Sequence, residues 1–332
     1  MFRSAGRFVF QGLQQRNAGN RWCRNATAVK MAKGNVQEVL IPVPWGHIAG
    51  KWWGDRSVQP VLGLHGWEDN CNTFDTLVPL LNVPSFLAVD IMGHGLSSRF
   101  PAAGPHSFMD VVMLLRRISE YFKWTKISIV GHSFGSAVGY VYSALFPDAV
   151  DAYVSIDCAR TDMMPQKENL LDEIRYTINR TLELEKRLAL DPPSYTYEEL
   201  VELLYAGLNK SPSRDSCRIL LQRGMKESSQ GHRRYYLARD PRLKSRWSGA
   251  LTEEFLLACA PMIKCRVLSI RATGGILQGG KCKEVYLHTL DLIQQCELHD
   301  VEGSHHLHLN NPENIAPLIN KFLHPPVRSC NL

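Results

Sequence analysis

Short apolar runs separated by polar turns follow one another from about residue 38 onward. Four of them, at 39–43, 48–53, 60–64 and 85–89, have the length and the β-branched and aromatic content typical of strands. From Ser107 the apolar positions change to a spacing of three and four residues, which predicts a helix with one face on a sheet. Ser107 and Asp110 have the spacing of a capping box, so we expect the helix to begin there.

Strands and helices then alternate along the chain. A strand is predicted at 127–130, a helix up to Pro147 and another strand at 152–156. The same order returns later, with strands at 266–270 and 296–301, a helix at 283–294 between them, and a last helix that begins at Pro312. This alternation predicts an α/β fold, in which a mostly parallel, doubly wound sheet carries crossover helices on both faces.

The stretch between these two parts has a different pattern. Residues 160–255 show helical spacing only, most clearly at 170–188 and 197–208. We therefore predict an α/β core formed by residues 38–159 and 256–325, with a helical cap of residues 160–255 inserted into it. Residues 1–37 form a separate leader.

The positive charge of the chain is concentrated in that leader. Seven Lys and Arg residues and no acidic residue precede Glu38, and taking these seven from the total of +6 leaves residues 38–332 at −1. A nearly neutral folded part gives no electrostatic reason to expect a nucleic-acid partner. No apolar run reaches the roughly 18 residues of a membrane-spanning helix, so we expect no transmembrane segment.

The leader and the cysteines bear on the compartment. An Arg-rich leader without acidic residues is typical of a mitochondrial transit peptide, and a disordered extension is the alternative. The final Cys330-Asn331-Leu332 distantly resembles a peroxisomal signal. The nine cysteines include no C-x-x-C pair, which favours a reducing compartment. We expect an intracellular protein, with mitochondria, cytoplasm and peroxisomes as the alternatives.

One short motif carries chemistry. Gly131-His132-Ser133-Phe134-Gly135 follows a predicted apolar strand and precedes a predicted helix rich in small residues. In that setting the pattern Gly-x-Ser-x-Gly is typical of a nucleophile elbow, a sharp turn that exposes the serine at the end of a strand. Glycines suit such a turn because they have no Cβ atom to collide with it. Ser133 is therefore the candidate nucleophile.

A serine hydroxyl needs a base that takes its proton, and histidine is the usual one. His305 follows the last predicted strand, in the sequence Glu302-Gly303-Ser304-His305. A loop at that edge of an open α/β sheet is where ligands bind. We predict that His305 is the base, with His306 and His308 as competitors in the same loop.

An oxyanion formed at Ser133 would need two donors aimed at it. The backbone N–H of Phe134, directly after the serine, is the first candidate. The second is expected in the loop after the third strand, His65-Gly66-Trp67, and we predict the N–H of Trp67. We expect the His65 side chain to support this loop rather than to transfer protons.

Together these segments resemble the α/β-hydrolase superfamily over about residues 38–324. The stretches that carry the resemblance are His65-Gly66-Trp67, the segment from Asp90 to Ser97 with Gly93-His94-Gly95, the elbow, and the loop at Gly303-Ser304-His305. The sequences of two segments, Trp45-Gly46-His47-Ile48 and Arg239-Asp240-Pro241-Arg242-Leu243, are similar to those of the serine hydrolase-like proteins of animals. The resemblance implies an α/β-hydrolase fold, and we expect 90–97 to be a structural turn.

The acid that should orient the histidine departs from the superfamily pattern. The resemblance implies an Asp after the strand 266–270, but the loop 271–283 contains no carboxylate. Asp157, at the end of the preceding strand, occupies an alternative acid position that some relatives use. We predict Asp157, with Glu284 or no functional acid as alternatives; a hydrogen bond between Asp157 and His305, within about 4 Å, is the geometric requirement.

These residues favour a serine hydrolase that cleaves a small or medium carboxylic ester, a thioester or a lipid-like acyl group through an acyl-enzyme on Ser133. No metal or organic cofactor is implied, and the partner is a small-molecule acyl substrate. The missing carboxylate in 271–283 motivates a rival hypothesis, a non-catalytic ligand-binding or sensor protein on the same fold. A carbon–carbon bond hydrolase or lyase with the same triad is a third.

Overall fold

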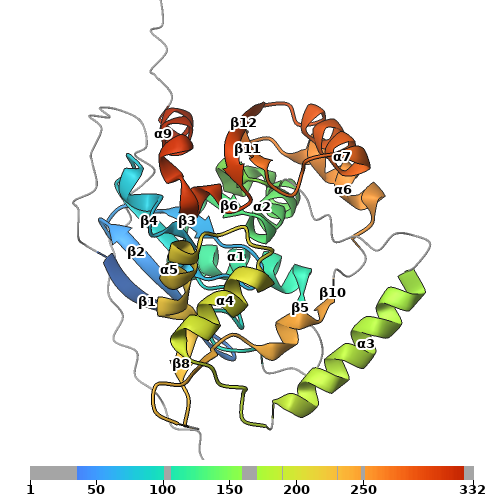
Figure 1. The fold of residues 1–332 in the computed structure, drawn as a ribbon. Coiled ribbons are helices and arrows are strands. Elements are labelled where there is room, and N and C mark those ends of the chain that lie inside the picture. The colour runs from blue at the N-terminus through green and yellow to red at the C-terminus, as the bar shows by residue number, and fades with distance from the viewer. Residues whose placement is uncertain are drawn as a thin grey trace, which may run out of the picture.

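The computed structural model describes residues 36–100, 106–158, 170–188, 190–229, 231–247 and 251–324, whose fold is shown in Figure 1. The predicted leader, apart from its last two residues, lies outside this part of the chain, as does the C-terminal tripeptide. No helix among the described residues is long and apolar enough to cross a membrane.

Eight strands form one sheet in the order β1-β2-β4-β3-β6-β7-β11-β12. Strand β2 is antiparallel to β1 and to β4, and every other neighbouring pair is parallel. The strands are β1 (Val36–Val43), β2 (Gly46–Gly54), β3 (Val61–Leu64), β4 (Ser85–Val89), β6 (Ile127–His132), β7 (Val150–Ile156), β11 (Arg266–Gly274) and β12 (Cys296–Ser304). The mostly parallel sheet that the sequence predicts is confirmed.

Helices cover both faces of the sheet, and each face has its own hydrophobic core. Alternate residues of a strand point to opposite faces, so Leu87 and Val89 of β4 pack into one core while Phe86 and Ala88 pack into the other. The first core includes residues of α1 (Phe108–Phe122), α2 (Phe134–Leu145), α6 (Glu253–Cys259) and α7 (Gly280–Asp291). The second includes the 3₁₀ turns η1 (Cys71–Phe74) and η2 (Val78–Leu80), and the helices α8 (Leu307–Asn310) and α9 (Ala316–Leu323).

The helix boundaries follow the local signals of the sequence in one case and depart from them in another. Ser107 caps α1 and forms the predicted capping box with Asp110. The last helix does not begin at Pro312, because Pro312–Asn314 form a 3₁₀ turn and α9 starts only at Ala316. Pro312 therefore begins a separate 3₁₀ turn that ends before α9.

Residues 170–247 contain more than helices. The helices are α3 (Leu170–Arg187), α4 (Tyr197–Gly207) and α5 (Arg214–Gly224). They are followed by an antiparallel hairpin of β8 (Met225–Glu227) and β9 (Tyr235–Leu237), and β10 (Arg246–Trp247) pairs with β5 (His106–Ser107). The prediction of helices only was wrong here, because strands of two or three residues are too short to show an alternating pattern.

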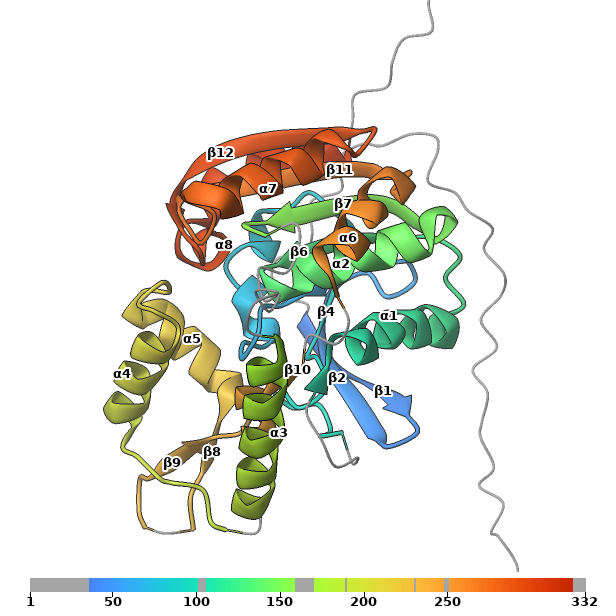
Figure 2. The same cartoon turned by 90° about the vertical axis from the view of Figure 1, so that its right-hand side faces the viewer.

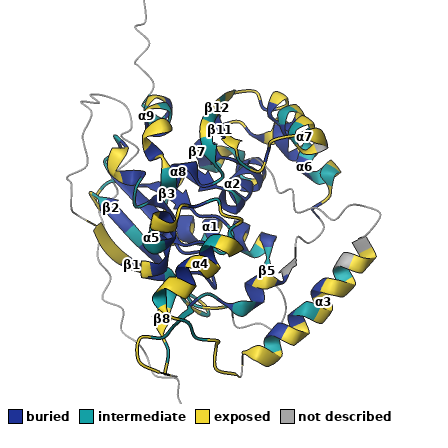
Figure 3. Ribbon diagram, in the orientation of Figure 1, coloured by how far each residue is buried: buried dark blue, intermediate teal, exposed yellow. Residues whose placement is uncertain are grey.

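In Figure 2 these elements gather at the opposite side of the molecule from β12 and α7. Figure 3 shows that the inner strands of the large sheet are mostly buried, whereas the edge strand β1 and the outer faces of α3 and α4 are exposed.

A buried ion pair fastens α5 to the sheet. The Arg223 guanidinium donates to Asp90 Oδ2 at 2.6 Å and to Glu38 Oε1 at 2.6 Å. Asp90 also accepts hydrogen bonds from the backbone N–H groups of Cys71 and Leu96. Every partner of the Asp90 carboxylate is therefore structural, in agreement with the turn expected at residues 90–97.

The segment 239–243 makes a second connection. The Arg239 guanidinium lies 3.2 Å from the carboxylate of Glu68, in the loop after β3. Arg242 pairs with Asp240 at 2.7 Å, and the Leu243 carbonyl accepts a hydrogen bond from the indole N–H of Trp67. The first connection therefore joins α5 to β1 and to the loop after β4, and the second joins residues 239–243 to the loop after β3.

Replacement of Arg223 by Met should lower the free energy of unfolding by about 3–5 kcal/mol, because the buried Asp90 carboxylate would lose its counter-charge. Arg214→Met is the matched control: its ion pair with Glu202 is exposed and should contribute little. Urea denaturation of both variants measures the difference. Equal unfolding midpoints for the two variants would contradict the anchoring role of Arg223.

Candidate active site

Ser133 lies in the turn between β6 and α2, with a backbone φ of 51° and ψ of −117°. A residue with a side chain rarely adopts this backbone conformation, which costs about 1–3 kcal/mol and persists only where the surroundings impose it. Here the neighbouring backbone does so: a Cβ atom on Gly135 would lie 2.2 Å from the Leu64 carbonyl oxygen, and one on Gly131 would lie 2.6 Å from the Ser136 nitrogen. The two glycines of the motif therefore permit a close packing that forces the sharp turn at Ser133.

The register of β6 and β7 places Asp157 beside Ser133 at the end of the strands. His132 pairs with Ile156 across β6 and β7, and the N–H of Ser133 donates to the Ile156 carbonyl at 3.1 Å. Ser133 and Asp157 are each the next residue beyond that pair. They consequently leave neighbouring strands at the same edge of the sheet.

The Asp157 side chain is completely buried and its carboxylate accepts three hydrogen bonds. Oδ1 accepts from the N–H of Ala272 at 2.8 Å, and Oδ2 accepts from the N–H of Ile276 at 3.2 Å. Oδ2 also lies 2.6 Å from Nδ1 of His305, the first residue after β12. Asp157 and His305 thus meet the distance requirement stated above.

This contact fixes the histidine ring. The other two bonds to Asp157 come from backbone N–H groups. A carboxylate oxygen accepts, so His305 Nδ1 carries the hydrogen that it shares with Oδ2. In the neutral ring, Nε2 then has the free lone pair. Among the described residues no hydrogen bond joins Ser133 Oγ to His305; catalytic bonds of this kind often tighten only in the substrate complex.

The competing candidates have other surroundings. Glu284 lies in α7 and makes no hydrogen bond to His305 within the described part of the chain. His306 Nδ1 lies 2.8 Å from Ser211 Oγ, and His308 Nε2 lies 2.7 Å from Thr73 Oγ1. Neither of these two histidines is hydrogen-bonded to Asp157.

The two residues predicted to stabilise an oxyanion lie side by side. The rings of Trp67 and Phe134 are in edge-to-face contact, with centroids 4.8 Å apart. Phe134 is the first residue of α2, so its backbone N–H has no carbonyl partner within the helix. The positive end of the α2 dipole is therefore next to Ser133.

Two buried histidines hold the loop that contains Trp67. His65 Nε2 accepts from the N–H of Ile91 at 2.9 Å, and its Nδ1 donates to the Gly66 carbonyl at 2.7 Å. His94 Nε2 accepts from the N–H of Glu68 at 3.1 Å. Burial lowers the pKa of His65 to about 4. With both nitrogens bonded to backbone, His65 has the supporting role that the sequence suggested.

The residues that surround Asp157 were not among the predicted site residues. Gly275 packs so closely against the carboxylate that a Cβ atom on it would lie 2.1 Å from Oδ2. The pair Gly274-Gly275, in a loop without acidic residues, was the available signal. This loop provides two N–H donors to a carboxylate on the neighbouring strand, in place of an acid of its own.

The fold and this arrangement define a class. Residues 59–258 match the model of the alpha/beta hydrolase fold, and the chain belongs to the α/β-hydrolase family. A "Probable serine hydrolase" of Drosophila melanogaster is 36% identical over 299 residues, which cover 88% of this chain and 89% of that protein. A "Serine hydrolase-like protein" of Danio rerio is 35% identical over 315 residues, which cover 91% and 92%.

Solved structures agree on the fold. A hypothetical protein of Pseudomonas aeruginosa has a TM-score of 0.76 and 25% identity, and the match covers 86% of this chain and 97% of that chain. A thioesterase domain from the curacin biosynthetic pathway has a TM-score of 0.71 at 17% identity, covering 86% and 99%, and shows the fold alone. The predicted fold class and the predicted resemblance are confirmed.

Replacement of Gly275 by Ala should displace the Asp157 carboxylate and break its hydrogen bond to His305. A short bond of this kind gives a far-downfield ring N–H resonance in the proton NMR spectrum, which should disappear in Gly275→Ala. Gly279→Ala is the matched control, because a Cβ atom there meets nothing within 4 Å and the resonance should persist. Persistence of the resonance in both variants would contradict the packing described here.

Proposed function

We propose that this chain is a serine hydrolase that cleaves a small or medium carboxylic ester, a thioester or a lipid-like acyl group through an acyl-enzyme on Ser133. The observation that carries the proposal is the 2.6 Å contact between His305 Nδ1 and Asp157 Oδ2. Asp157 and Ser133 are the residues that directly follow the last paired residues of β7 and β6. A histidine oriented in this way, beside a serine in a strained elbow, is the arrangement that acyl transfer requires.

In the proposed reaction Ser133 Oγ attacks the acyl carbon and His305 Nε2 takes its proton. The tetrahedral intermediate collapses, the bond to the leaving group breaks, and His305 returns the proton to the leaving oxygen or sulfur. Water then attacks the acyl-enzyme in the same way and releases the carboxylic acid. Asp157 stays ionised throughout and stabilises the imidazolium that forms in each half-reaction.

The negative charge of each intermediate would be held by the backbone N–H groups of Phe134 and Trp67. The position of Phe134 at the first turn of α2 and the contact between the two rings support this assignment. The hydrogen bonds of His65 and His94 would keep the loop of Trp67 in place before substrate arrives.

We further propose that residues 160–255 act as the cap over this site and influence substrate choice. A small cavity between the loop after β3 and this segment supports the proposal. It is lined by Glu68, Asp69, Asn70, Gly95, Leu204, Leu220, Leu221, Gly224, Leu237 and Arg239. Four leucines from the segment face residues 68–70, so the segment lies against the loop that follows Trp67.

The rival hypothesis of a ligand sensor depended on the absence of an acid behind the histidine. The bond between Asp157 and His305 favours the hydrolase over this rival, because it would provide an acid directly after β7 in place of one in the loop 271–283. A carbon–carbon bond hydrolase or lyase would use the same residues, and no observation favours it.

A fluorophosphonate probe, which reacts with activated serines, should label the wild-type chain and should not label Ser133→Ala. Ser57→Ala, at an exposed serine in the turn between β2 and β3, should be labelled like the wild type. Labelling is read by fluorescence after gel electrophoresis and located by peptide mass spectrometry. Equal labelling of wild type and Ser133→Ala would refute the assignment of the nucleophile.

Asp157→Asn should reduce kcat for an activated ester by about 10⁴-fold, because the amide stabilises the wrong histidine tautomer and cannot stabilise the imidazolium. Glu284→Gln, at the rival acid, should retain wild-type turnover. Steady-state hydrolysis of p-nitrophenyl esters measures both. A large loss in Glu284→Gln with little loss in Asp157→Asn would reassign the acid.

A further inference from the structure

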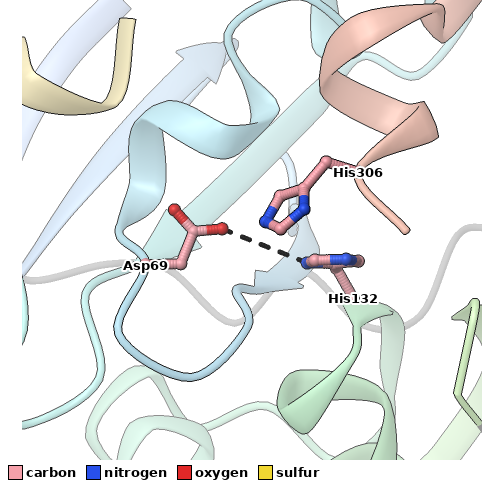
Figure 4. Close-up of side chains that lie close together, drawn as sticks. All are labelled: Asp69, His132 and His306. Carbon is pink, nitrogen blue, oxygen red and sulfur yellow. Dashed lines mark ion pairs between the residues drawn. The ribbon is translucent and has the colours of Figure 1, made fainter. Parts of the chain in front are cut away.

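Three side chains with metal-binding atoms point toward one another beside the elbow, and the proposed mechanism uses none of them. Asp69 lies in the loop after β3, His132 at the end of β6 and His306 in the loop after β12 (Figure 4). All three are buried, and one potential ligand atom of each lies within 4.8 Å of those of the other two.

The His132 ring presents a lone pair to this space. Its Nε2 lies 2.9 Å from the His305 carbonyl oxygen, and since a carbonyl only accepts, Nε2 carries the hydrogen. In the neutral imidazole ring one nitrogen donates and the other accepts. Nδ1 is then an acceptor, and it has no hydrogen-bond partner in the described part of the chain.

A second acceptor faces it. Asp69 Oδ1 accepts from the N–H of Asn70 at 2.8 Å, but Oδ2 has no partner among the described residues. Oδ2 lies 4.0 Å from His132 Nδ1, along the dashed line of Figure 4. Two buried acceptors that face each other without a donor between them are costly, and a cation between them would remove the cost.

His306 is the third candidate metal ligand. His306 Nδ1 lies 2.8 Å from Ser211 Oγ, which leaves Nε2 for coordination. Histidines that bind metals almost always donate their other ring N–H to a nearby oxygen. His132 donates in this way to the His305 carbonyl, and His306 can donate to Ser211.

We propose that Asp69, His132 and His306 form a binding site for a divalent transition-metal ion, with Zn²⁺ as the best match. Two imidazoles and one carboxylate suit zinc, with a fourth position left for water. The small cavity under the cap is lined by Asp69 as well. The proposal departs from the sequence analysis, which implied no metal, because residues from three distant segments meet only in the fold.

Occupancy of this site should inhibit hydrolysis, an expectation that rests on the function proposed above. Ligands around a tetrahedral zinc ion lie about 3.3 Å apart, so the side chains must close in from their present spacing. His132 and His306 are the chain neighbours of Ser133 and His305. A displacement of about 1 Å at reacting groups can reduce the rate about 100-fold.

Isothermal titration calorimetry of the full chain, first treated with a chelator, tests the site without reference to activity. The wild type should bind one equivalent of Zn²⁺. Asp69→Asn and His306→Gln should each bind Zn²⁺ more than about 100-fold more weakly. Removal of a hydrogen-bond partner of a ligand alone lowers metal affinity by about 10–100-fold, and the loss of a ligand should cost more. Ser211→Ala, which removes only the support of His306, should weaken binding by about 10–100-fold.

His299→Gln is the matched control, since His299 and Glu297 form an exposed pair on β12 that could also attract zinc. This variant should bind Zn²⁺ like the wild type. Absence of one-to-one binding in the wild type, or a loss confined to His299→Gln, would overturn the proposal.

Crystals of the wild type soaked in Zn²⁺ give a test that does not depend on whether the variants fold. An anomalous peak should appear about 2.0–2.2 Å from an oxygen of Asp69 and from nitrogens of His132 and His306. A peak on His305 alone would place the metal in the active site and reject the separate site.

Ester hydrolysis with and without Zn²⁺ tests the inhibition. Zinc should reduce wild-type turnover and should have little effect on the residual turnover of Asp69→Asn. Binding without inhibition would refute the inhibitory role, whereas a metal-free wild type without any hydrolysis would refute the proposed function instead.

Discussion

A carboxylate that is completely buried needs hydrogen-bond partners for both of its oxygens, and the way Asp157 meets this requirement organises the site. The backbone N–H groups of Ala272 in β11 and of Ile276 in the loop after it, and the Nδ1–H of His305, converge on it. The first two hold the carboxylate in place directly after β7. The third fixes the His305 ring so that Nε2 is the free nitrogen. One side chain thus connects β7, β11 and the loop after β12.

The register of the sheet determines where along the strands the other site residues lie relative to Asp157. Ile156 pairs with His132 on one side and with Ile270 on the other. Ser133 and Asp157 therefore leave the sheet together, and both have positive φ angles of 51°. Strain of this kind persists only where the surroundings impose it, here through close backbone packing at Gly131 and Gly135. The proposed base, acid and nucleophile are consequently positioned by the sheet rather than by mobile segments.

Much of the fold follows from apolar periodicity, and several site candidates follow from local motifs. The elbow could be predicted because Gly-x-Ser-x-Gly between a strand and a helix is a local signal, and Asp157 because it ends a strand. The N–H groups of Ala272 and Ile276 could not be predicted as its partners, since any residue type carries a backbone N–H. The hairpin of β8 and β9 is too short to show a period. The cluster of Asp69, His132 and His306 depends on which strand ends become neighbours, and local sequence does not encode that.

The central claim is that Ser133, a histidine fixed by Asp157 and the N–H groups of Trp67 and Phe134 converge on one reacting group. A crystal structure of the chain after reaction with a phosphonate ester tests it most directly. The account predicts phosphorus bonded to Ser133 Oγ, a phosphonyl oxygen about 2.7–3.1 Å from both N–H groups, and an intact bond between His305 and Asp157. A phosphonyl oxygen far from Trp67 and Phe134, or a His305 ring turned away from Asp157, would contradict it.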